Sequence, residues 1–267
     1  MTTTQDLKQQ HRAARQAHRA SKSRQPIGSA NSAVIDCACV IHSTGYDWQY
    51  VEKLHSMLTR YLPGGIRMHV YTEADRSVPP HMIKHVLTEW PGIAGPKRSW
   101  WYKMQLFNPA LFQGNMLYFD LDCVIVNDLT WITQLDSSLF WGIKDFKYLQ
   151  QPVSIINSSV MWFNTDQFAW LWQRFSDQGV DVARQGCQGD QDYITKNIDP
   201  NSRRFFDTKY FQSYRWQCLD GGYDFKYRRY HKPGTGVTIA PDTAVIVFHG
   251  SPNPHQVSDP TIAALWR

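Results

Sequence analysis

Two aspartates near the middle of the chain, Asp120 and Asp122, have the type and spacing of a metal-binding pair. They follow an apolar run, Met116 to Phe119, that is typical of a buried strand. Because residues two apart in a strand point to the same side, both carboxylates can converge at the end of that strand. Two buried negative charges need a positive partner between them. The pair therefore predicts a divalent cation that carries a phosphorylated substrate.

A histidine at the end of a later strand could complete the ligand set. The apolar run Ala244 to Phe248 predicts a buried strand, and His249 follows it directly, ahead of a loop shaped by glycine and proline. A lone histidine in such a place more often packs against a turn than binds a metal. Beside two carboxylates, an imidazole favours Mn²⁺, which accepts both kinds of ligand, with Mg²⁺ as the alternative ion.

Three further segments offer polar groups to a ligand. Asp190 and Gln191 either face a pocket and hold hydroxyl groups or, for Asp190, cap a helix. Lys103 is either a surface lysine or a point charge for a phosphate. Asn157 and Ser158 form either a plain turn or a place where a ligand approaches the backbone.

The elements before the aspartate pair predict a ligand-binding edge. Val34–Ile41 reads as a strand, Asp47 can cap the helix that follows, and Ile66–Tyr71 reads as a second strand. A strand–helix–strand unit favours a parallel sheet, and open α/β sheets bind ligands at the carboxyl ends of their strands. The turn after the first strand holds Ser43 and Thr44, which we therefore expect near the ligand.

The rest of the chain completes an α/β fold. The pattern predicts helices over 80–90, 99–107, 165–176 and 189–196, and strands over 140–143 and 160–163. Thr165 can cap the third of these helices. We expect one domain, residues 33–267, with a central mixed, mostly parallel sheet flanked by helices.

Residues 1–32 differ in composition from the rest. They hold the whole excess of five positive charges, so residues 33–267 are neutral overall and give no reason to expect nucleic-acid binding. The first 32 residues have few apolar groups, which predicts a disordered basic tail. The alternative is a weak contact of this tail with an anionic membrane or polymer.

The cysteines and the hydropathy indicate the compartment. Five cysteines without CxxC spacing argue against a disulfide framework or a zinc site. No apolar stretch approaches the roughly 20 residues of a membrane span, and the first residues lack the apolar core of a secretory signal. The prediction is a cytoplasmic protein, with peripheral membrane attachment as the alternative.

Four motifs in order resemble those of a GT-A fold glycosyltransferase of the family 8 type, which includes glycogenin-like and bacterial galactosyltransferases. They are a YxDxD-like motif at Tyr118–Asp122, an NSG-type turn at Asn157–Ser159, a DQD segment at Asp190–Asp192 and an HGxxKPW-like motif at His249–His255. The resemblance covers most of residues 33–267.

The resemblance implies a Mn²⁺-dependent, retaining transfer of a sugar from a nucleotide-sugar, most often a UDP-sugar. It implies that Asp120, Asp122 and His249 bind the metal, with Asp120 also near the ribose. Lys103 then lies near the donor, and Asp190 and Gln191 lie by the transferred sugar. The acceptor can be a glycan, a lipid-linked sugar, a protein or a small molecule.

The chain departs from the family pattern at three positions. Asn253 stands where lysine is usual, His255 where tryptophan is common, and Ser159 where glycine is usual. The first change removes a phosphate-binding charge, so these departures bear on donor affinity and sugar identity.

Two other classes of protein compete with this interpretation. Phe119–Asp122 resembles the nucleophile motif of haloacid-dehalogenase-type phosphohydrolases, and Gly189–Asp192 resembles their late acidic motif. In that family, however, the nucleophile motif normally opens the domain. The third possibility is a non-catalytic carbohydrate-binding relative that has kept the fold.

Overall fold

The computed structural model describes residues 34–43, 45–94, 98–219, 223–224, 229–230 and 236–267. They belong to one compact unit, Ala33–Arg267. The predicted tail, residues 1–32, lies outside the described residues.

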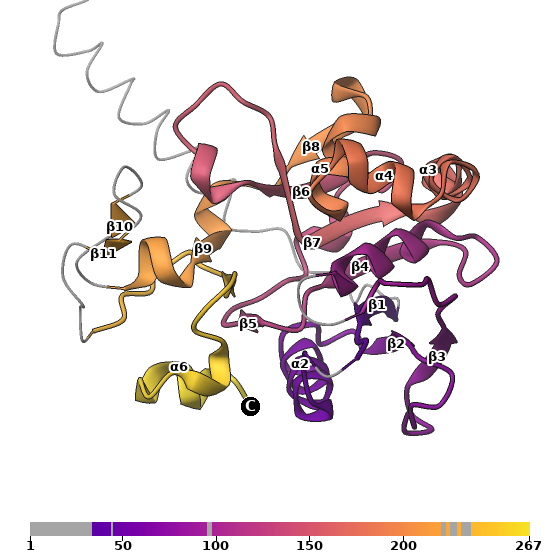
Figure 1. Cartoon of the computed structure of the whole chain (residues 1–267). Coiled ribbons are helices and arrows are strands. Elements are labelled where there is room, and N and C mark those ends of the chain that lie inside the picture. The colour runs from indigo at the N-terminus through magenta and orange to yellow at the C-terminus, as the bar shows by residue number, and fades with distance from the viewer. Residues whose placement is uncertain (1–33, 44, 95–97, 220–222, 225–228, 231–235) are drawn as a thin grey trace, which may run out of the picture. The chain divides into compact units, whose positions relative to one another are not determined.

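The main sheet of the described chain has seven strands in the order β3-β2-β1-β4-β7-β6-β8 (Figure 1). Their bounds are Ile35–Val40 (β1), Ile66–Thr72 (β2), Ile83–Val86 (β3), Asn115–Phe119 (β4), Phe140–Lys144 (β6), Ile156–Asn164 (β7) and Arg203–Phe205 (β8). Strands β3, β2, β1 and β4 run parallel, β7 is antiparallel to β4 and β6, and β8 is parallel to β6. The predicted mixed, mostly parallel α/β sheet is confirmed.

A smaller sheet joins the end of the aspartate segment to the segment before His249. It consists of β5 (Cys123–Ile125), β12 (Val245–Val247) and β9 (Phe211–Ser213), with β12 in the middle. Strands β12 and β5 are antiparallel, and the register continues beyond them, since Phe248 donates its backbone N–H to the carbonyl of Asp122 at 3.2 Å. This pairing explains why residues far apart in sequence meet. A separate two-residue pair joins β10 (Tyr223–Asp224) to β11 (Arg229–Tyr230).

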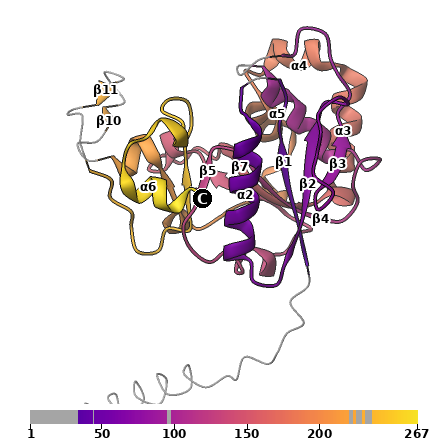
Figure 2. The ribbon, with the colours of Figure 1, turned by 90° about the horizontal axis from the view of Figure 1, so that it is seen from below.

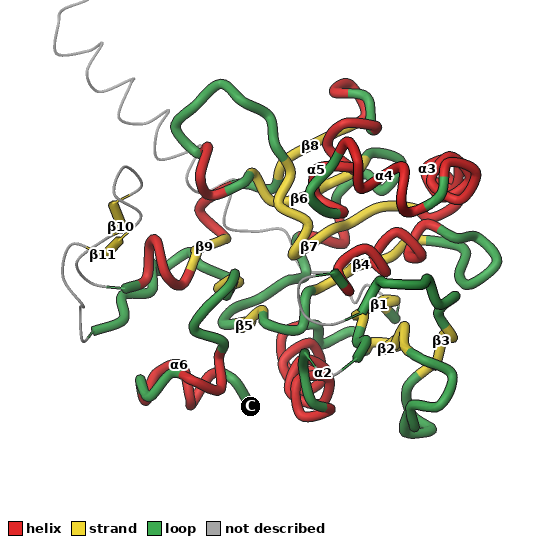
Figure 3. The backbone as a smooth tube through the Cα atoms, in the orientation of Figure 1, coloured by secondary structure: helices red, strands yellow, loops and turns green. Residues whose placement is uncertain are grey.

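Helices cover both faces of the main sheet (Figures 1 and 2). They are α2 (Trp48–Tyr61), α3 (Thr165–Gln178), α4 (Val180–Gly186), α5 (Asp190–Asn197) and the 3₁₀ helix η1 (Ser99–Phe107). The last helix, α6 (Pro260–Leu265), packs against β5 of the smaller sheet. Short 3₁₀ helices span Ile132–Gln134, Phe146–Tyr148, Pro200–Ser202, Thr208–Tyr210 and Pro254–Gln256, and a π-helical turn spans Tyr214–Cys218. Helices α3, α4, α5 and η1 gather on one side, away from α2 (Figure 3).

The alternation of side chains in the strands divides the core into two clusters. In β4, Leu117 and Phe119 pack with the apolar face of α2, whereas Met116 and Tyr118 pack with α3 and η1 on the other face. Because both faces of the sheet are buried, its strands are held in fixed positions. The residues at the strand ends, where the site lies, are then held in place as well.

The helix caps agree only in part with the sequence. Asp47 accepts from the backbone N–H of Gln49 at 3.0 Å and caps α2, as predicted. The cap of α3 is Asn164, whose side chain accepts from the N–H groups of Asp166 and Gln167, so the predicted cap at Thr165 is wrong by one residue.

The predicted helix over 80–90 is wrong. Its middle is the edge strand β3, which pairs in parallel with β2 from His69↔Ile83 to Thr72↔Val86. The unpaired edge of β2 supplies backbone partners that outweigh local helix propensity, and the side chains of Ile83 and Val86 remain exposed. The 3₁₀ helix η1 and α5 occupy the predicted helical segments 99–107 and 189–196.

Two further observations concern the described residues. All five cysteines are free thiols, and four of them are buried. No helix in the described ranges has the length and apolar character that crossing a bilayer requires.

Candidate functional site

A cavity of about 530 Å³ opens where the carboxyl ends of β1 and β4 meet the segment after β12. Its volume lies within the usual range of ligand pockets, roughly 300–1,000 Å³. The lining side chains include four of the residues that the sequence singled out: Lys103, Asp120, Asp122 and His249. The sequence thus predicted the place of the cavity as well as part of its wall.

Lys103 lies between two carboxylates at the floor of the cavity. Its ammonium is 2.8 Å from Asp120 Oδ1 and 3.4 Å from Asp190 Oδ2, and it donates to Ser158 Oγ at 3.3 Å. Burial opposes the charge on Lys103, but the charges of Asp120 and Asp190 outweigh burial and raise its pKa. Lys103 therefore stays protonated and is the internal counter-ion of both aspartates.

Asp190 is held by side chains rather than by its own helix. Ser158 donates its hydroxyl to Asp190 Oδ2 at 2.6 Å. The N-cap of α5 is Gly189, so Asp190 does not cap this helix, which was one of its two possible roles. Asp190 and Ser158 contact Lys103 but do not line the cavity. These two residues therefore hold the Lys103 side chain in position from outside the cavity.

Asp122 is the least compensated carboxylate of the site. It is 8 % exposed, and its one side-chain hydrogen-bond donor among the described contacts is Tyr46, whose hydroxyl lies 2.9 Å from Oδ2. Burial and, second, the negative charge of Asp120 raise the pKa of Asp122 to about 7. A buried carboxylate with so little compensating positive charge attracts a cation that enters the cavity.

His249 reaches the cavity from the end of β12. Its Nε2 is 2.6 Å from Ser213 Oγ, and its ring lies between Phe146 and Trp216, with centroid distances of 5.7 and 4.2 Å. Burial and, second, the charge of Arg215 lower the pKa of His249 to about 4. The imidazole is therefore neutral near pH 7 and keeps the lone pair that a metal ligand needs.

The donor set fits a divalent cation in its chemistry. Two carboxylates and a neutral imidazole line the same cavity, and the raised pKa of Asp122 indicates a deficit of positive charge. These three side chains do not form a preassembled metal site. In the described part of the chain, no three His, Cys, Asp or Glu side chains lie close enough to share one ion.

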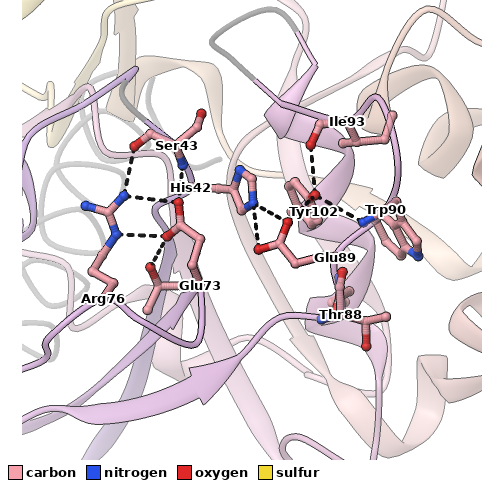
Figure 4. Close-up of polar contacts among 11 residues, drawn as sticks. His42, Ser43, Glu73, Arg76, Thr88, Glu89, Trp90, Ile93 and Tyr102 are labelled. Carbon is pink, nitrogen blue, oxygen red and sulfur yellow. Dashed lines mark hydrogen bonds and ion pairs between the residues drawn. The ribbon is translucent and has the colours of Figure 1, made fainter.

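The turn after β1 is fixed by a half-buried carboxylate, Glu73 (Figure 4). Glu73 accepts from the backbone N–H of Ser43, from Thr72 Oγ1 at 2.7 Å and from Arg76 Nε at 2.8 Å, and Arg76 also donates to the carbonyl of Ser43. Burial raises the pKa of Glu73, but these hydrogen bonds, with Arg76 first, lower it to about 2. The turn is thus held without any ligand, with Ser43 at φ 57°.

A second network sets the ring of His42 at the start of the same turn (Figure 4). Its Nε2 lies 3.1 and 2.9 Å from the two carboxylate oxygens of Glu89, and its ring stacks on Tyr102 at 3.9 Å. The tyrosine hydroxyl also donates to Glu89 at 3.1 Å. His42 lines the cavity, and its other nitrogen, Nδ1, is buried without a hydrogen-bond partner.

The remaining predicted site residues lie outside the cavity wall. Ser43 and Asn157 are not part of the lining, and Thr44 lies outside the described residues. The amide of Gln191 donates to Asp145 Oδ2 at 2.8 Å, and Gln191 does not line the cavity either. The roles predicted for these residues stay predictions.

The three departures from the family pattern have different surroundings. Asn253 and Ser159 line the cavity, so no lysine charge is present at the position of Asn253. His255 instead contacts the hydroxyl of Tyr50 through Nδ1 and packs edge-on against that ring at 5.7 Å.

His42, Tyr46 and Trp100 are among the lining residues that were not predicted as site residues from the sequence. The first two belong to the turn at the end of the first predicted strand, whose position pointed to the ligand edge. Trp100 had a signal of another kind, because it lies three residues before Lys103 and a 3₁₀ helix places such residues on the same face.

No protein-family model matches the sequence, and no curated protein matches it. Solved structures do. The chain is similar to the galactosyltransferase LgtC in complex with donor and acceptor sugar analogs, with 14 % identity, a TM-score of 0.58, and coverage of 87 % of this chain and 95 % of LgtC.

Two further similar structures are larger proteins. The glycosyltransferase GlyE of Streptococcus pneumoniae TIGR4 has 14 % identity and a TM-score of 0.58 over 88 % of this chain and 59 % of GlyE. The bifunctional glycosyltransferase WbbM has 13 % identity and a TM-score of 0.53 over 86 % of this chain and 48 % of WbbM. At these identities the comparisons establish the fold alone: the chain has the GT-A fold of these glycosyltransferases.

Proposed function

We propose that this chain is a metal-dependent glycosyltransferase that moves a sugar from a UDP-sugar to an acceptor hydroxyl, with retention of anomeric configuration. The observation that carries the proposal is one cavity lined by Asp120, Asp122, Lys103 and His249 at the carboxyl edge of β1 and β4. The fold supports it, because LgtC, which shares this fold, binds donor and acceptor sugar analogs. Open α/β sheets bind nucleotides at this edge.

The two ends of the cavity suit the two ends of a nucleotide-sugar. At the β1 end, His42 and Tyr46 offer ring surfaces and a buried imidazole nitrogen to a nucleobase. At the β4 end, Asp120, Asp122 and His249 provide the charged groups for the diphosphate.

Asp120, Asp122 and His249 would hold the metal ion. When bound, Mn²⁺ supplies positive charge to the diphosphate, on which negative charge develops as the sugar departs. The chain's own contribution is to keep both carboxylates at the cavity wall, one fixed by Lys103 and the other by Tyr46. Fixed groups of this kind need little reorganisation during the reaction.

The contacts of Gln191 bear on retention. A covalent intermediate needs a nucleophile that reaches the anomeric carbon, and an amide is a poor one. Gln191 is hydrogen-bonded to Asp145, outside the cavity wall, and Asp190 is engaged by Lys103 and Ser158. These contacts favour attack by the acceptor hydroxyl on the face that the diphosphate leaves.

The fold disfavours the two competing classes to different degrees. A haloacid-dehalogenase-type phosphohydrolase would begin its sheet with the nucleophile strand, whereas here β1, α2, β2 and β3 all precede β4. A non-catalytic carbohydrate-binding protein has no need of a buried carboxylate whose charge is only partly compensated, as that of Asp122 is. Sugar transfer accounts for both features.

A melting experiment with UDP separates these classes. We expect UDP together with Mn²⁺ to raise the melting temperature of the full chain, because ligand at about 100 times its Kd stabilises a protein by roughly 2.7 kcal/mol. UDP with EDTA should have a much smaller effect, and AMP with Mn²⁺ serves as the control nucleotide. Release of inorganic phosphate from generic phosphate esters, without any shift by UDP, would instead identify a phosphohydrolase.

A further inference from the structure

The indole of Trp100 stands apart from the other exposed apolar side chains. Large apolar side chains that are at least a third exposed in the described residues are Val34, Ile83, Val86, Trp100, Val153, Trp170 and Val182. Among these, Trp100 lines the 530 Å³ cavity. Its neighbours Trp101 and Tyr102 are buried in the core, so η1 is anchored while Trp100 faces the ligand space.

The geometry of η1 places Trp100 beside the charged floor. Side chains three residues apart in a 3₁₀ helix lie on one face, and Trp100 and Lys103 both line the cavity. Lys103 contacts Asp120, which belongs to the region proposed for the diphosphate. A sugar bonded to that diphosphate lies next to it, in the cavity that Trp100 also lines.

The indole of Trp100 packs closely against the backbone of Gly189, which has no side chain. A Cβ built on Gly189 would lie 3.0 Å from Trp100 Nε1 and 3.3 Å from Cδ1, which is closer than side chains normally approach. The indole therefore rests against the backbone just before Asp190. Gly189 directly precedes α5, which begins with Asp190. The same short segment therefore contacts the indole of Trp100 and carries the Asp190 carboxylate.

We propose that Trp100 is the stacking surface for the transferred sugar of the donor, a neutral pyranose that packs the apolar C–H face of its ring against the indole. Rigid aromatic side chains bury large areas at low entropy cost, and tryptophan is enriched where binding energy concentrates. Lys103 and the polar groups beside it then meet the hydroxyls on the ring's edge. The inference rests on the proposed function, since it assigns the sugar end of the same cavity.

The test compares UDP with UDP-sugars that do not turn over. Calorimetry with Mn²⁺ measures Kd for UDP and for the 2-deoxy-2-fluoro analogues of UDP-glucose and UDP-galactose, whose fluorine slows cleavage of the sugar bond. Trp100→Ala should weaken binding of the preferred UDP-sugar analogue about tenfold and that of UDP less than about twofold. Trp100→Phe, which keeps an aromatic plate, should retain most of the affinity.

Two further variants control for structural damage. Trp170→Ala removes an equally exposed tryptophan on α3, outside the cavity, and should change neither Kd. Gly189→Ala shifts the indole by a few tenths of an ångström without removing it, so it should produce a smaller loss that is also selective for the UDP-sugar.

Each outcome decides the inference. Equal losses for UDP and the UDP-sugar analogue, or no loss for either, in Trp100→Ala would overturn the assignment. An unchanged Kd for the analogue with a raised KM for the acceptor would assign the indole to the acceptor instead. Failure of the unmodified chain to bind UDP would refute the proposed function itself, and the sugar assignment with it.

Discussion

Asp122→Asn is expected to lower kcat/KM for Mn²⁺-dependent cleavage of a UDP-sugar by at least about 10³-fold while leaving the protein folded. Asparagine has the size of aspartate and can still accept from the Tyr46 hydroxyl, now 2.9 Å from Oδ2. It cannot supply the negative charge that binds the cation. The measurement is UDP release at saturating Mn²⁺, with Asp181→Asn, an 82 % exposed carboxylate, as the control.

The same substitution should stabilise the metal-free protein. The pKa of Asp122 is raised from 3.8 to about 7, so the folded state binds a proton more tightly than the unfolded state does. Stability conferred by the protonated form is lost as the pH rises from about 4 to about 7. Urea unfolding in EDTA should therefore show an advantage of Asp122→Asn that grows across this range and is constant above it. Full activity, or a variant less stable than the parent at pH 7, would contradict the assigned role.

Lys103→Met is expected to cost about 3–5 kcal/mol of unfolding free energy at pH 7, the usual effect of breaking a buried ion pair. The substitution keeps an unbranched side chain one atom shorter than lysine but leaves Asp120 and Asp190 without their counter-ion. Loss of the ammonium should also abolish sugar transfer, because both carboxylates lose their positions. Urea unfolding followed by circular dichroism measures the change.

A matched lysine distinguishes this effect from the loss of any ion pair. Lys209 and Asp207 also form a pair, at 3.3 Å, but both side chains are about half exposed. Lys209→Met should change the unfolding free energy far less than Lys103→Met does, because water and salt screen an exposed ion pair. If the two lysine variants lost the same stability, the carboxylates around Lys103 would have another source of compensation.

Local sequence patterns predicted the elements that carry the site, because apolar runs and helix caps are set by neighbouring residues and do not depend on tertiary contacts. The apolar runs before Asp120 and His249 form β4 and the segment around β12, and Asp47 caps α2. Both parts of the candidate site therefore follow from where strands end. The fold class follows from the strand–helix–strand unit in the same way.

Contacts between distant segments were beyond the reach of such patterns. Strand β3 was predicted as a helix because its pairing with β2 is a tertiary contact. For Asp190 the sequence left two roles open, a helix cap or a group facing a pocket, and neither names its partner Lys103, from a segment 87 positions earlier. Tyr46, which holds Asp122, likewise carries no signal of its role in the sequence around it.

The central claim is that the cavity binds a nucleotide-sugar and activates its sugar bond. The most direct measurement is UDP release from UDP-glucose, UDP-galactose and their N-acetylhexosamine counterparts by the full chain, with Mn²⁺ or with EDTA. The account predicts that at least one UDP-sugar is cleaved in Mn²⁺, slowly by water alone, and that EDTA abolishes the reaction. Cleavage that is equally fast in EDTA, or no cleavage of any nucleotide-sugar together with no binding of UDP, would contradict it.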